Sequence, residues 1–225
     1  MPTVFITGAN RGIGLEFVRQ YAADGWTVIA TVRDPGKADE LNAIEGDVTV
    51  RALDLDGDFF EIDWNKVVGS EPIDVFINNA GVMGPTKLET IEHAAAMVNA
   101  LAVNTVAPVV LAKAALPLVA AAKGKMVALS SKMGSIADNG SGGFIAYRAT
   151  KAGLNAAWRS LAIDVKDQGV VAATLHPGWV QTDMGGANAP LGVEESVTGL
   201  RAVIDGLTPE RAGGFYNYDG ATIPW

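Results

Sequence analysis

Two side chains that could carry acid–base chemistry, Tyr147 and Lys151, lie four residues apart in a stretch that predicts a helix over 147–168. That spacing places both side chains on one face of the helix. A tyrosine has a pKa of about 10, and a neighbouring cation favours its phenolate form. Such a pair could exchange a proton with a substrate oxygen, but it could equally be a surface pair. The sequence elements around the pair indicate which of these two roles applies.

Short apolar strands alternate with helical patterns along the whole chain. We expect strands at 2–7, 27–32, 48–53, 73–78, 125–130 and 170–175, a seventh at 214–218, and helices at 12–24, 63–69, 90–122 and 147–168. The 90–122 stretch contains Pro108 and Pro117, so we expect two helices or one kinked helix there. Strands that are apolar on both faces are typical of a parallel sheet covered by helices on both sides. No composition shift marks a second domain. We therefore predict one doubly wound α/β domain over residues 1–225.

A glycine-rich turn follows the first strand and opens the first helix, with the sequence Thr-Gly-Ala-Asn-Arg-Gly-Ile-Gly at 7–14. Gly8 permits a tight turn, Gly12 lets the backbone approach a pyrophosphate, and Gly14 lets the helix pack closely on the strand. Free N–H groups at the start of a helix favour phosphate. The position of this turn favours a dinucleotide site over a purely structural turn.

From this turn onwards the sequence resembles the short-chain dehydrogenase/reductase family, whose members carry a T-G-x-x-x-G-x-G turn. Further motifs of that family recur in order, namely Asn78-Asn79-Ala80-Gly81, Asn104, Ser131, Tyr147-x-x-x-Lys151 and Pro177-Gly178-x-x-x-Thr182. The segments 131–136, 146–151 and 176–184 are similar to those of the subgroup of C-factor signalling proteins and sniffer-type carbonyl reductases. The resemblance covers nearly the whole chain and implies a single Rossmann-type domain.

The resemblance also implies a role for each matching catalytic residue. Tyr147 would be the general acid, and Lys151 would lower the Tyr147 pKa and bind the nicotinamide ribose. Ser131 would hydrogen-bond the carbonyl oxygen, and Asn104 would hold a water that links Lys151 to solvent. The Ser131–Tyr147 spacing is longer than usual in the family, so Ser135 stays an alternative, and the glycine-rich 138–143 loop is the natural place for the extra residues.

NADPH is the cofactor that the second strand's end favours. There Arg33 precedes Asp34: an acidic residue at this place binds the ribose hydroxyls of NAD, whereas an Arg accommodates the 2′-phosphate of NADP. Arg11 and Arg33 favour NADP(H), because guanidinium groups bond phosphate in pairs, and NAD(H) held by Asp34 is the alternative. The cofactor contacts implied by the resemblance are Gly8, Asn10, Arg11, Gly12, Ile13, Gly14, Arg33, Asp54, Leu55, Asn79, Ala80, Gly81, Tyr147, Lys151, Pro177, Gly178, Val180 and Thr182.

Composition excludes several other classes of protein. The chain has 225 residues, a net charge of −8, two His and no Cys. An acidic chain lacks the basic face that nucleic acid or an anionic membrane requires, and the absent Cys excludes thiolate sites. We expect no metal site, no signal peptide and no membrane span, since polar residues and prolines interrupt the apolar stretch 94–122. The expected location is the cytoplasm.

Together these observations predict an NADPH-dependent reductase of a small uncharged carbonyl compound, an aldehyde or a ketone. The 138–144 loop and a short lid near 183–191 would select the substrate, and the chain would form a homo-oligomer, a dimer or a tetramer. The alternative is a C-factor-like signalling or regulatory protein that binds the cofactor and in which catalysis is incidental. An extended sugar-nucleotide epimerase does not fit, because 225 residues leave no room for its substrate domain.

Overall fold

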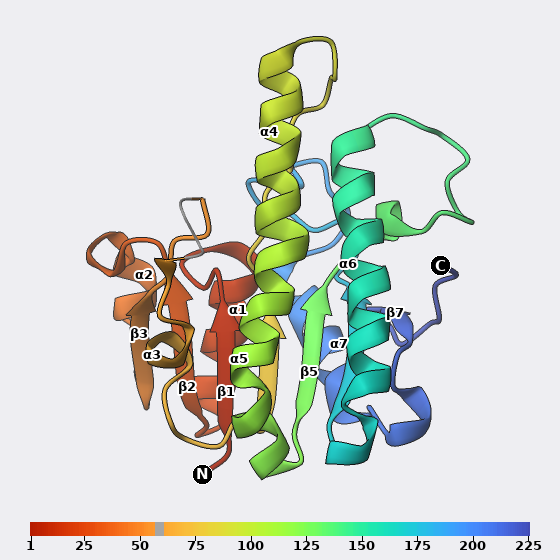
Figure 1. Cartoon of the computed structure of the whole chain (residues 1–225). Helices are drawn as coiled ribbons and strands as arrows, with labels where there is room; N and C mark the ends of the chain where they lie inside the picture. Colours follow the sequence, from red (N-terminus) through yellow and green to blue (C-terminus); the bar gives the residue numbers. More distant parts are fainter. Residues whose placement is uncertain (57–60) are drawn as a thin grey trace.

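The computed structural model of the chain describes residues 1–56 and 61–225, and its centre is one sheet of parallel strands (Figure 1). The strand order is β3-β2-β1-β4-β5-β6-β7. The strands are β1 (Thr3–Thr7), β2 (Thr27–Val32), β3 (Val48–Ala52), β4 (Val75–Asn78), β5 (Lys125–Leu129), β6 (Val171–His176) and β7 (Phe215–Asn217). β1, β4, β5 and β6 are buried along most of their length, as their apolar sequences predict.

Helices cover both faces of this sheet (Figure 1). One face packs against α1 (Gly12–Ala23), the short α2 (Asp39–Asn42) and α7 (Val193–Asp205). The other packs against α3 (Trp64–Val68), α5 (Ala107–Ala122) and α6 (Ile145–Asp164). The doubly wound α/β prediction is confirmed by this arrangement.

Helix α7 is the main element that the sequence analysis did not predict. Its buried side chains, among them Val197, Leu200 and Ile204, face the core, but Gly199 interrupts the apolar pattern between them. The glycine is required because a Cβ at this position would come within 2.6 Å of the Tyr218 carbonyl oxygen. The other differences are at element ends; for example, α6 begins at Ile145 rather than at 147.

The predicted break in the 90–122 helix takes the form of a widened turn. Helix α4 (Ile91–Leu101) passes through a π-helical segment (Ala102–Val106) into α5, so the chain stays helical from Ile91 to Ala122. Pro108 lies at the start of α5, directly after the π-helical segment, and Pro117 lies inside the helix. By length and composition alone, these 32 residues are nevertheless long and apolar enough to cross a membrane, so the expectation that polar residues and prolines exclude a span on these grounds is wrong. In the structure, α5 packs against β4 and β5 as a core helix.

The strand order reverses at β1, which lies between β2 and β4. The chain leaves β1 toward β2 and β3, then crosses over to β4 on the other side. The loops that follow β1 and β4 therefore diverge, and open α/β sheets bind ligands in the crevice that results.

Candidate active site

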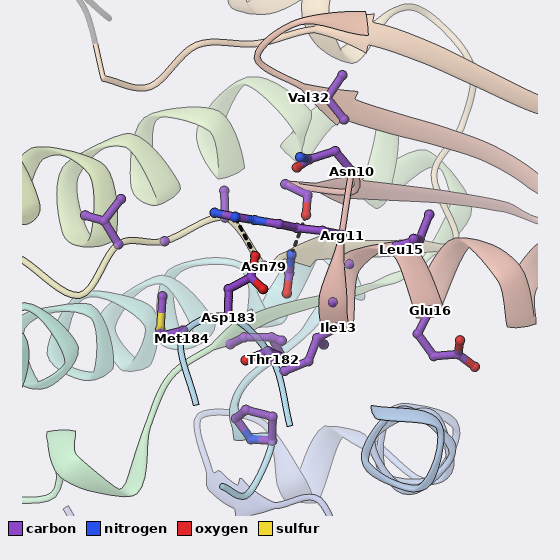
Figure 2. Close-up of a pocket in the computed structure, with 18 of the residues that line it drawn as sticks. Asn10, Arg11, Ile13, Leu15, Glu16, Val32, Asn79, Thr182, Asp183 and Met184 are labelled. Atoms are coloured by element: carbon purple, nitrogen blue, oxygen red, sulfur yellow. Dashed lines mark hydrogen bonds and ion pairs between the residues drawn. The ribbon is translucent and has the colours of Figure 1, made fainter. Parts of the chain in front are cut away.

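A cavity of about 770 Å³ lies at the carboxyl edge of the sheet, over this reversal. Its walls come from the loops that follow β1, β2, β4, β5 and β6 and from the start of α6. Most of the predicted cofactor contacts line it, namely Gly8, Asn10, Arg11, Gly12, Ile13, Gly14, Arg33, Leu55, Asn79, Ala80, Gly81, Tyr147, Lys151, Pro177 and Thr182. Figure 2 shows the turn residues Asn10, Arg11 and Ile13 on one side and Thr182, Asp183 and Met184 on the other.

The glycine turn has the backbone that the sequence predicts. Gly8 and Gly12 have φ angles of +65° and +53°, a region that side-chain-bearing residues rarely adopt. A Cβ on Gly14 would collide with the carbonyl oxygen of Gly8, so this glycine allows the start of α1 to pack against the turn. Arg11, the N-cap of α1, makes no side-chain cap, which leaves the first N–H groups of the helix facing the cavity.

Asn79 fastens the loop after β4 to the glycine turn. Its side-chain amide donates to the carbonyl oxygens of Thr7 (2.9 Å) and Gly8 (3.0 Å). In return, the Thr7 hydroxyl accepts from the backbone N–H groups of Asn79 and Ala80, both at 3.0 Å. These four hydrogen bonds fix the distance between the loop after β1 and the loop after β4. The Asn-Asn-Ala-Gly motif therefore helps to define the wall of the cavity.

Tyr147 and Lys151 line the cavity, and Ser131 lies beside Tyr147 without lining the cavity itself. Lys151 Nζ lies 5.8 Å from the centre of the Tyr147 ring, on the helix face that the four-residue spacing predicts. Ser131 follows β5 as the N-cap of a 3-10 turn, and its hydroxyl makes a hydrogen bond with the Tyr147 phenol that lowers the tyrosine pKa. All three side chains are buried.

The protonation of Tyr147 differs from the expectation. Burial raises the pKa of Tyr147 above its usual value of 10.0, and the Ser131 hydrogen bond opposes that rise only in part. The ammonium group of Lys151 donates to the Leu129 carbonyl oxygen at 2.8 Å, and the predicted lowering of the Tyr147 pKa by Lys151 stays a prediction. Tyr147 is therefore a phenol at neutral pH, which is the form that can donate a proton.

Lys151 is buried to 5 % exposure without a carboxylate partner among the described residues. Burial lowers its pKa from 10.5 to about 8. The ammonium form still predominates at neutral pH, so Lys151 brings one positive charge into the apolar wall of the cavity. A buried group with a displaced pKa in a cleft is typical of functional sites.

Asn104 lies in the π-helical segment and is fully buried. Its amide nitrogen donates to the Val82 carbonyl oxygen (2.7 Å) and the Thr150 hydroxyl (3.0 Å), and its oxygen accepts from Val82 N–H (2.8 Å). A Cβ on Gly81 would meet both the Asn104 oxygen and Lys151 Nζ within 3.6 Å. Asn104 therefore joins the loop after β4 to α6 close to Lys151, and its predicted role through a water stays a prediction.

The alternative serine, Ser135, has a structural role. It is buried, and its hydroxyl accepts from the Asp138 backbone N–H at 3.1 Å, which closes the turn that begins the 138–143 loop. The 138–143 loop, where the extra residues of the Ser131–Tyr147 spacing are expected, is exposed. The geometry therefore favours Ser131 as the serine beside Tyr147.

A second cavity of about 440 Å³ adjoins the first at the tip of β2 and contains Arg33, Asp34 and Lys37. The Asp34 carboxylate accepts from the Gly36 backbone N–H at 3.0 Å and pairs with Lys37 Nζ at 3.0 Å. Both contacts lower the pKa of Asp34 and occupy its oxygens within the chain. The carboxylate that would bind a ribose in NAD proteins is thus engaged, while Arg33 has no carboxylate partner among the described residues.

Arg11 reaches across the mouth of the main cavity, as Figure 2 shows, and pairs with Asp183 at 2.6 Å. Both side chains are well exposed. The pair joins the glycine turn to the segment that the sequence analysis predicts to be a lid. Because an exposed ion pair contributes little to stability, it can separate when a ligand enters.

Some predicted contacts do not line the main cavity. Gly178 packs against Leu191 and Tyr218 and shapes the turn, with φ +86°. Val180 is buried and forms a β-bridge with Leu191, and Asp54 lines only the second cavity. Conversely, the sequence analysis missed several residues that line one of the cavities, including Thr31, Lys37, Val82, Leu129 and Ser130. Lys37 was detectable as a second cation after Arg33, but the others carry no local signal.

The model of the family described as short chain dehydrogenase matches residues 2–190 of this chain. The chain belongs to the short-chain dehydrogenase family. It is accordingly an oxidoreductase of that family, as its Tyr-x-x-x-Lys pair and glycine turn indicate.

Relatives and solved structures place the chain in the predicted subgroup. It is 46% identical to the C-signal of Myxococcus xanthus over 156 residues, which is 68% of this chain and 93% of that protein. Among solved structures, the carbonyl reductase Sniffer of D. melanogaster is 34% identical with a TM-score of 0.90, and 100% of both chains is covered. The NADPH-bound carbonyl reductase from chicken fatty liver is 30% identical with a TM-score of 0.88, covering 100% of this chain and 99% of that one. The predicted resemblance to C-factor and sniffer-type proteins is confirmed.

Proposed function

We propose that this short-chain dehydrogenase is an NADP(H)-dependent carbonyl reductase that converts a small aldehyde or ketone to an alcohol. The observation that carries the proposal is a buried cluster in which Tyr147 and Lys151 line the same cavity as the glycine turn and Ser131 lies beside Tyr147. The same groups would serve the reverse oxidation. NADPH, when bound, supplies the hydride.

The residues of the cavity fit a dinucleotide. Two buried hydroxyls on its wall, those of Thr31 and Ser130, have no hydrogen-bond partner within residues 1–56 and 61–225, and a polar ligand would satisfy them. At the tip of β2, Arg33 and Lys37 supply positive charge beside an Asp34 carboxylate that is already engaged. This arrangement supports a 2′-phosphate rather than free ribose hydroxyls, and the NADPH bound to the chicken carbonyl reductase agrees with it.

In the proposed reaction the chain's own groups orient the carbonyl and move one proton. The Ser131 hydroxyl and the Tyr147 phenol would both hydrogen-bond the carbonyl oxygen, and Tyr147 would then donate its proton to the developing alkoxide. The Lys151 ammonium would stabilise the phenolate that is left, since the two groups share the buried end of the cavity. Asn104 would keep Lys151 connected to solvent for reprotonation.

The segment after β6 carries large apolar side chains as well as the Asp183 that pairs with Arg11. Trp179 and Met184 are exposed large side chains on the segment after β6, and the Trp179 indole N–H is fixed by a 2.8 Å bond to the Gly185 carbonyl oxygen. We include in the proposal that residues 183–191 form a lid on a single domain that spans residues 1–225. An uncharged carbonyl compound would suit such a mouth.

The direct test follows the oxidation of NADPH with a panel of aldehydes, ketones and quinones. Tyr147→Phe is the matched variant, because it removes the phenol and keeps the ring. We expect carbonyl-dependent oxidation in the native protein and a loss of at least about 100-fold in kcat for the variant, which still binds NADPH. Absence of turnover across the panel, or a Tyr147→Phe variant of native activity, would contradict the proposal.

A second candidate function is suggested by the 46% identity to the C-signal, namely a cofactor-binding signalling or regulatory protein. A complete Ser131, Tyr147 and Lys151 cluster argues against it, because a sensor has no need of a proton donor. The Tyr147→Phe variant separates the two functions. Signalling activity that survives in this variant while NADPH still binds would favour the second candidate.

We also propose a cytoplasmic homo-oligomer. Helices α4 and α6 expose Ile91, Val98 and Ile163, with 84%, 67% and 66% of their surfaces accessible. Large apolar side chains in neighbouring helices are typical of a face that a second subunit covers. Light scattering coupled to size exclusion tests this: a mass of one chain would contradict it.

A further inference from the structure

Thr150 is a fully buried residue of α6 whose contacts the proposed reaction does not use. Its hydroxyl donates to the Tyr147 carbonyl oxygen at 2.8 Å and accepts from the Asn104 side-chain amide at 3.0 Å. The Thr150 backbone carbonyl oxygen accepts a further bond, from the Thr105 hydroxyl at 2.9 Å. Three side-chain hydrogen bonds therefore meet at one residue of the helix that carries the proposed proton donor.

The two bonds that reach Thr150 from outside α6 both come from the π-helical segment. Asn104 and Thr105 are neighbours there, and one bonds the Thr150 hydroxyl while the other bonds its carbonyl oxygen. Within residues 1–56 and 61–225, these are the hydrogen bonds that join this segment to α6. The two elements also approach closely here, since a Cβ on Gly153 would come within 3.2 Å of the Thr105 methyl group. Thr150 is therefore the point at which the π-helical segment holds α6.

The Asn104 side chain connects Thr150 to the loop after β4. Its oxygen accepts from the Val82 N–H, and its amide nitrogen donates to the Val82 carbonyl oxygen. The second hydrogen of the amide also needs an acceptor, because a buried donor without one is costly. The Thr150 hydroxyl can accept it, since its own hydrogen is used for the Tyr147 carbonyl oxygen. A continuous chain of hydrogen bonds thus runs from the loop to the backbone of Tyr147.

This chain of hydrogen bonds acts on the part of α6 that lines the main cavity. Tyr147 precedes Thr150 by three residues and Lys151 follows it directly, and both of these neighbours line the cavity. Residues 79–82 of the loop after β4 line the same cavity. A Cβ on Gly81 would lie 3.6 Å from Lys151 Nζ, so the loop and α6 are close together here. Small displacements of reacting groups cost large factors in rate, so the contact that fixes this distance matters for catalysis.

We propose that Thr150 is a positioning residue that holds Tyr147 and Lys151 in place against the loop after β4. It does so through its bonds to Asn104 and Thr105. The inference rests on the proposed carbonyl reductase function. Thr150 itself lines neither cavity, so its loss should displace the proton donor without removing a contact to substrate or cofactor. The expected signature is a lower kcat at nearly unchanged KM and NADPH affinity.

The test compares Thr150→Val, which keeps the branched shape but removes the hydroxyl, with Thr150→Ser, which keeps the hydroxyl. Thr105→Val removes the bond to the Thr150 carbonyl oxygen without a change in α6. The control is Trp158→Phe, which removes a buried hydrogen bond of the same helix, to the Met126 carbonyl oxygen, away from both cavities. Each protein is assayed for turnover of a carbonyl compound that the native protein reduces, NADPH affinity, urea unfolding and amide hydrogen exchange at Val82.

We expect Thr150→Val to lower kcat about tenfold, with KM and NADPH affinity within about threefold of native values. Thr150→Ser should keep kcat within about twofold of native, because both bonds of the hydroxyl remain. Thr105→Val should lower kcat about threefold. Trp158→Phe should keep a native kcat even though urea unfolds it earlier. Exchange at Val82, whose N–H donates to Asn104, should accelerate in Thr150→Val and stay native in Thr150→Ser and the control.

A native kcat in Thr150→Val would overturn the inference. An equal loss of kcat in Trp158→Phe would also overturn it, because any weakening of α6 would then be enough. So would a Thr150→Ser protein as slow as Thr150→Val, since the hydroxyl would not be the responsible group. If Thr150→Val does not fold, Thr105→Val decides, and a native kcat in that variant counts against the inference.

The exchange measurement separates this inference from the proposed function. If the native protein reduces no carbonyl compound, the proposed function fails. Exchange at Val82 still shows, without any turnover, whether Thr150 holds Asn104 against the loop after β4. Unchanged exchange in Thr150→Val would mean that it does not, so the two failures are distinguishable.

Discussion

Replacing Lys151 by Met should abolish the proposed activity and, at neutral pH, stabilise the fold. The ammonium group is buried and has one acceptor, the Leu129 carbonyl oxygen. Burial lowers its pKa from 10.5 to about 8, and this difference corresponds to roughly 3 kcal/mol lost from the free energy of unfolding while the group is charged. Removing the hydrogen bond to Leu129 returns about 1 kcal/mol of that, so we expect a net gain of about 2 kcal/mol.

The pH dependence of stability separates this cause from better packing. Above a pH of about 8 the folded protein releases the Lys151 proton, while the unfolded chain keeps it up to 10.5. The unfolded state then binds more protons, so the native protein gains stability as pH rises through this window. The advantage of Lys151→Met should therefore shrink by about 1 kcal/mol between about pH 7 and pH 9.

Urea denaturation of the native protein, Lys151→Met and the exposed control Lys113→Met at both pH values measures these differences. Taking each variant against the native protein at the same pH cancels the titration of all other groups. The control should show no pH-dependent difference. A Lys151→Met protein that is less stable than native near neutral pH, by an amount that does not change with pH, would refute the reasoning.

Three further predictions concern the cofactor end of the cavity. Gly14→Ala should prevent NADPH binding and destabilise the fold by about 2 kcal/mol or more, measured by fluorescence titration and urea denaturation, because its Cβ would overlap the backbone of the glycine turn. Asp183→Asn should tighten NADPH binding a few-fold at low salt and leave NADH binding unchanged, since it frees Arg11; equal effects on both cofactors would argue against this. Arg33→Ala combined with Lys37→Ala should weaken NADPH about 100-fold relative to NADH, and a preserved preference would show that the phosphate binds elsewhere.

The parts of the site that the sequence predicts best are those that depend only on residues close together in the chain. The glycine turn needs positive φ angles, and its own glycines show this in the sequence. Tyr147 and Lys151 lie side by side because a helix places residues four apart on one face. The alternation of apolar strands with helices predicts the sheet and its layers for the same reason. Each of these signals is local.

Features that depend on distant partners were not predictable. The backbone of Tyr218 leaves no room for a Cβ at position 199 of α7, which is why this residue is a glycine. The sequence pattern of the helix alone does not reveal this contact. The pKa of Tyr147 depends on how deeply the ring is buried and on which acceptor Lys151 chooses, and the spacing of the pair fixes neither. The engagement of Asp34 by Lys37 likewise appears only once the turn between them is built.

The π-helical segment at Ala102–Val106 separates the registers of the two helices that it joins. One extra residue in a helical turn rotates everything before it by about 100° relative to everything after it. The apolar face of α5 can therefore pack on the sheet while α4, on the other side of the π-helical segment, turns a differently oriented face to its surroundings. A single-residue deletion within this segment would restore a regular turn and swing α4 around its axis, so the exposed surface of α4 can change in evolution without disturbing the sheet.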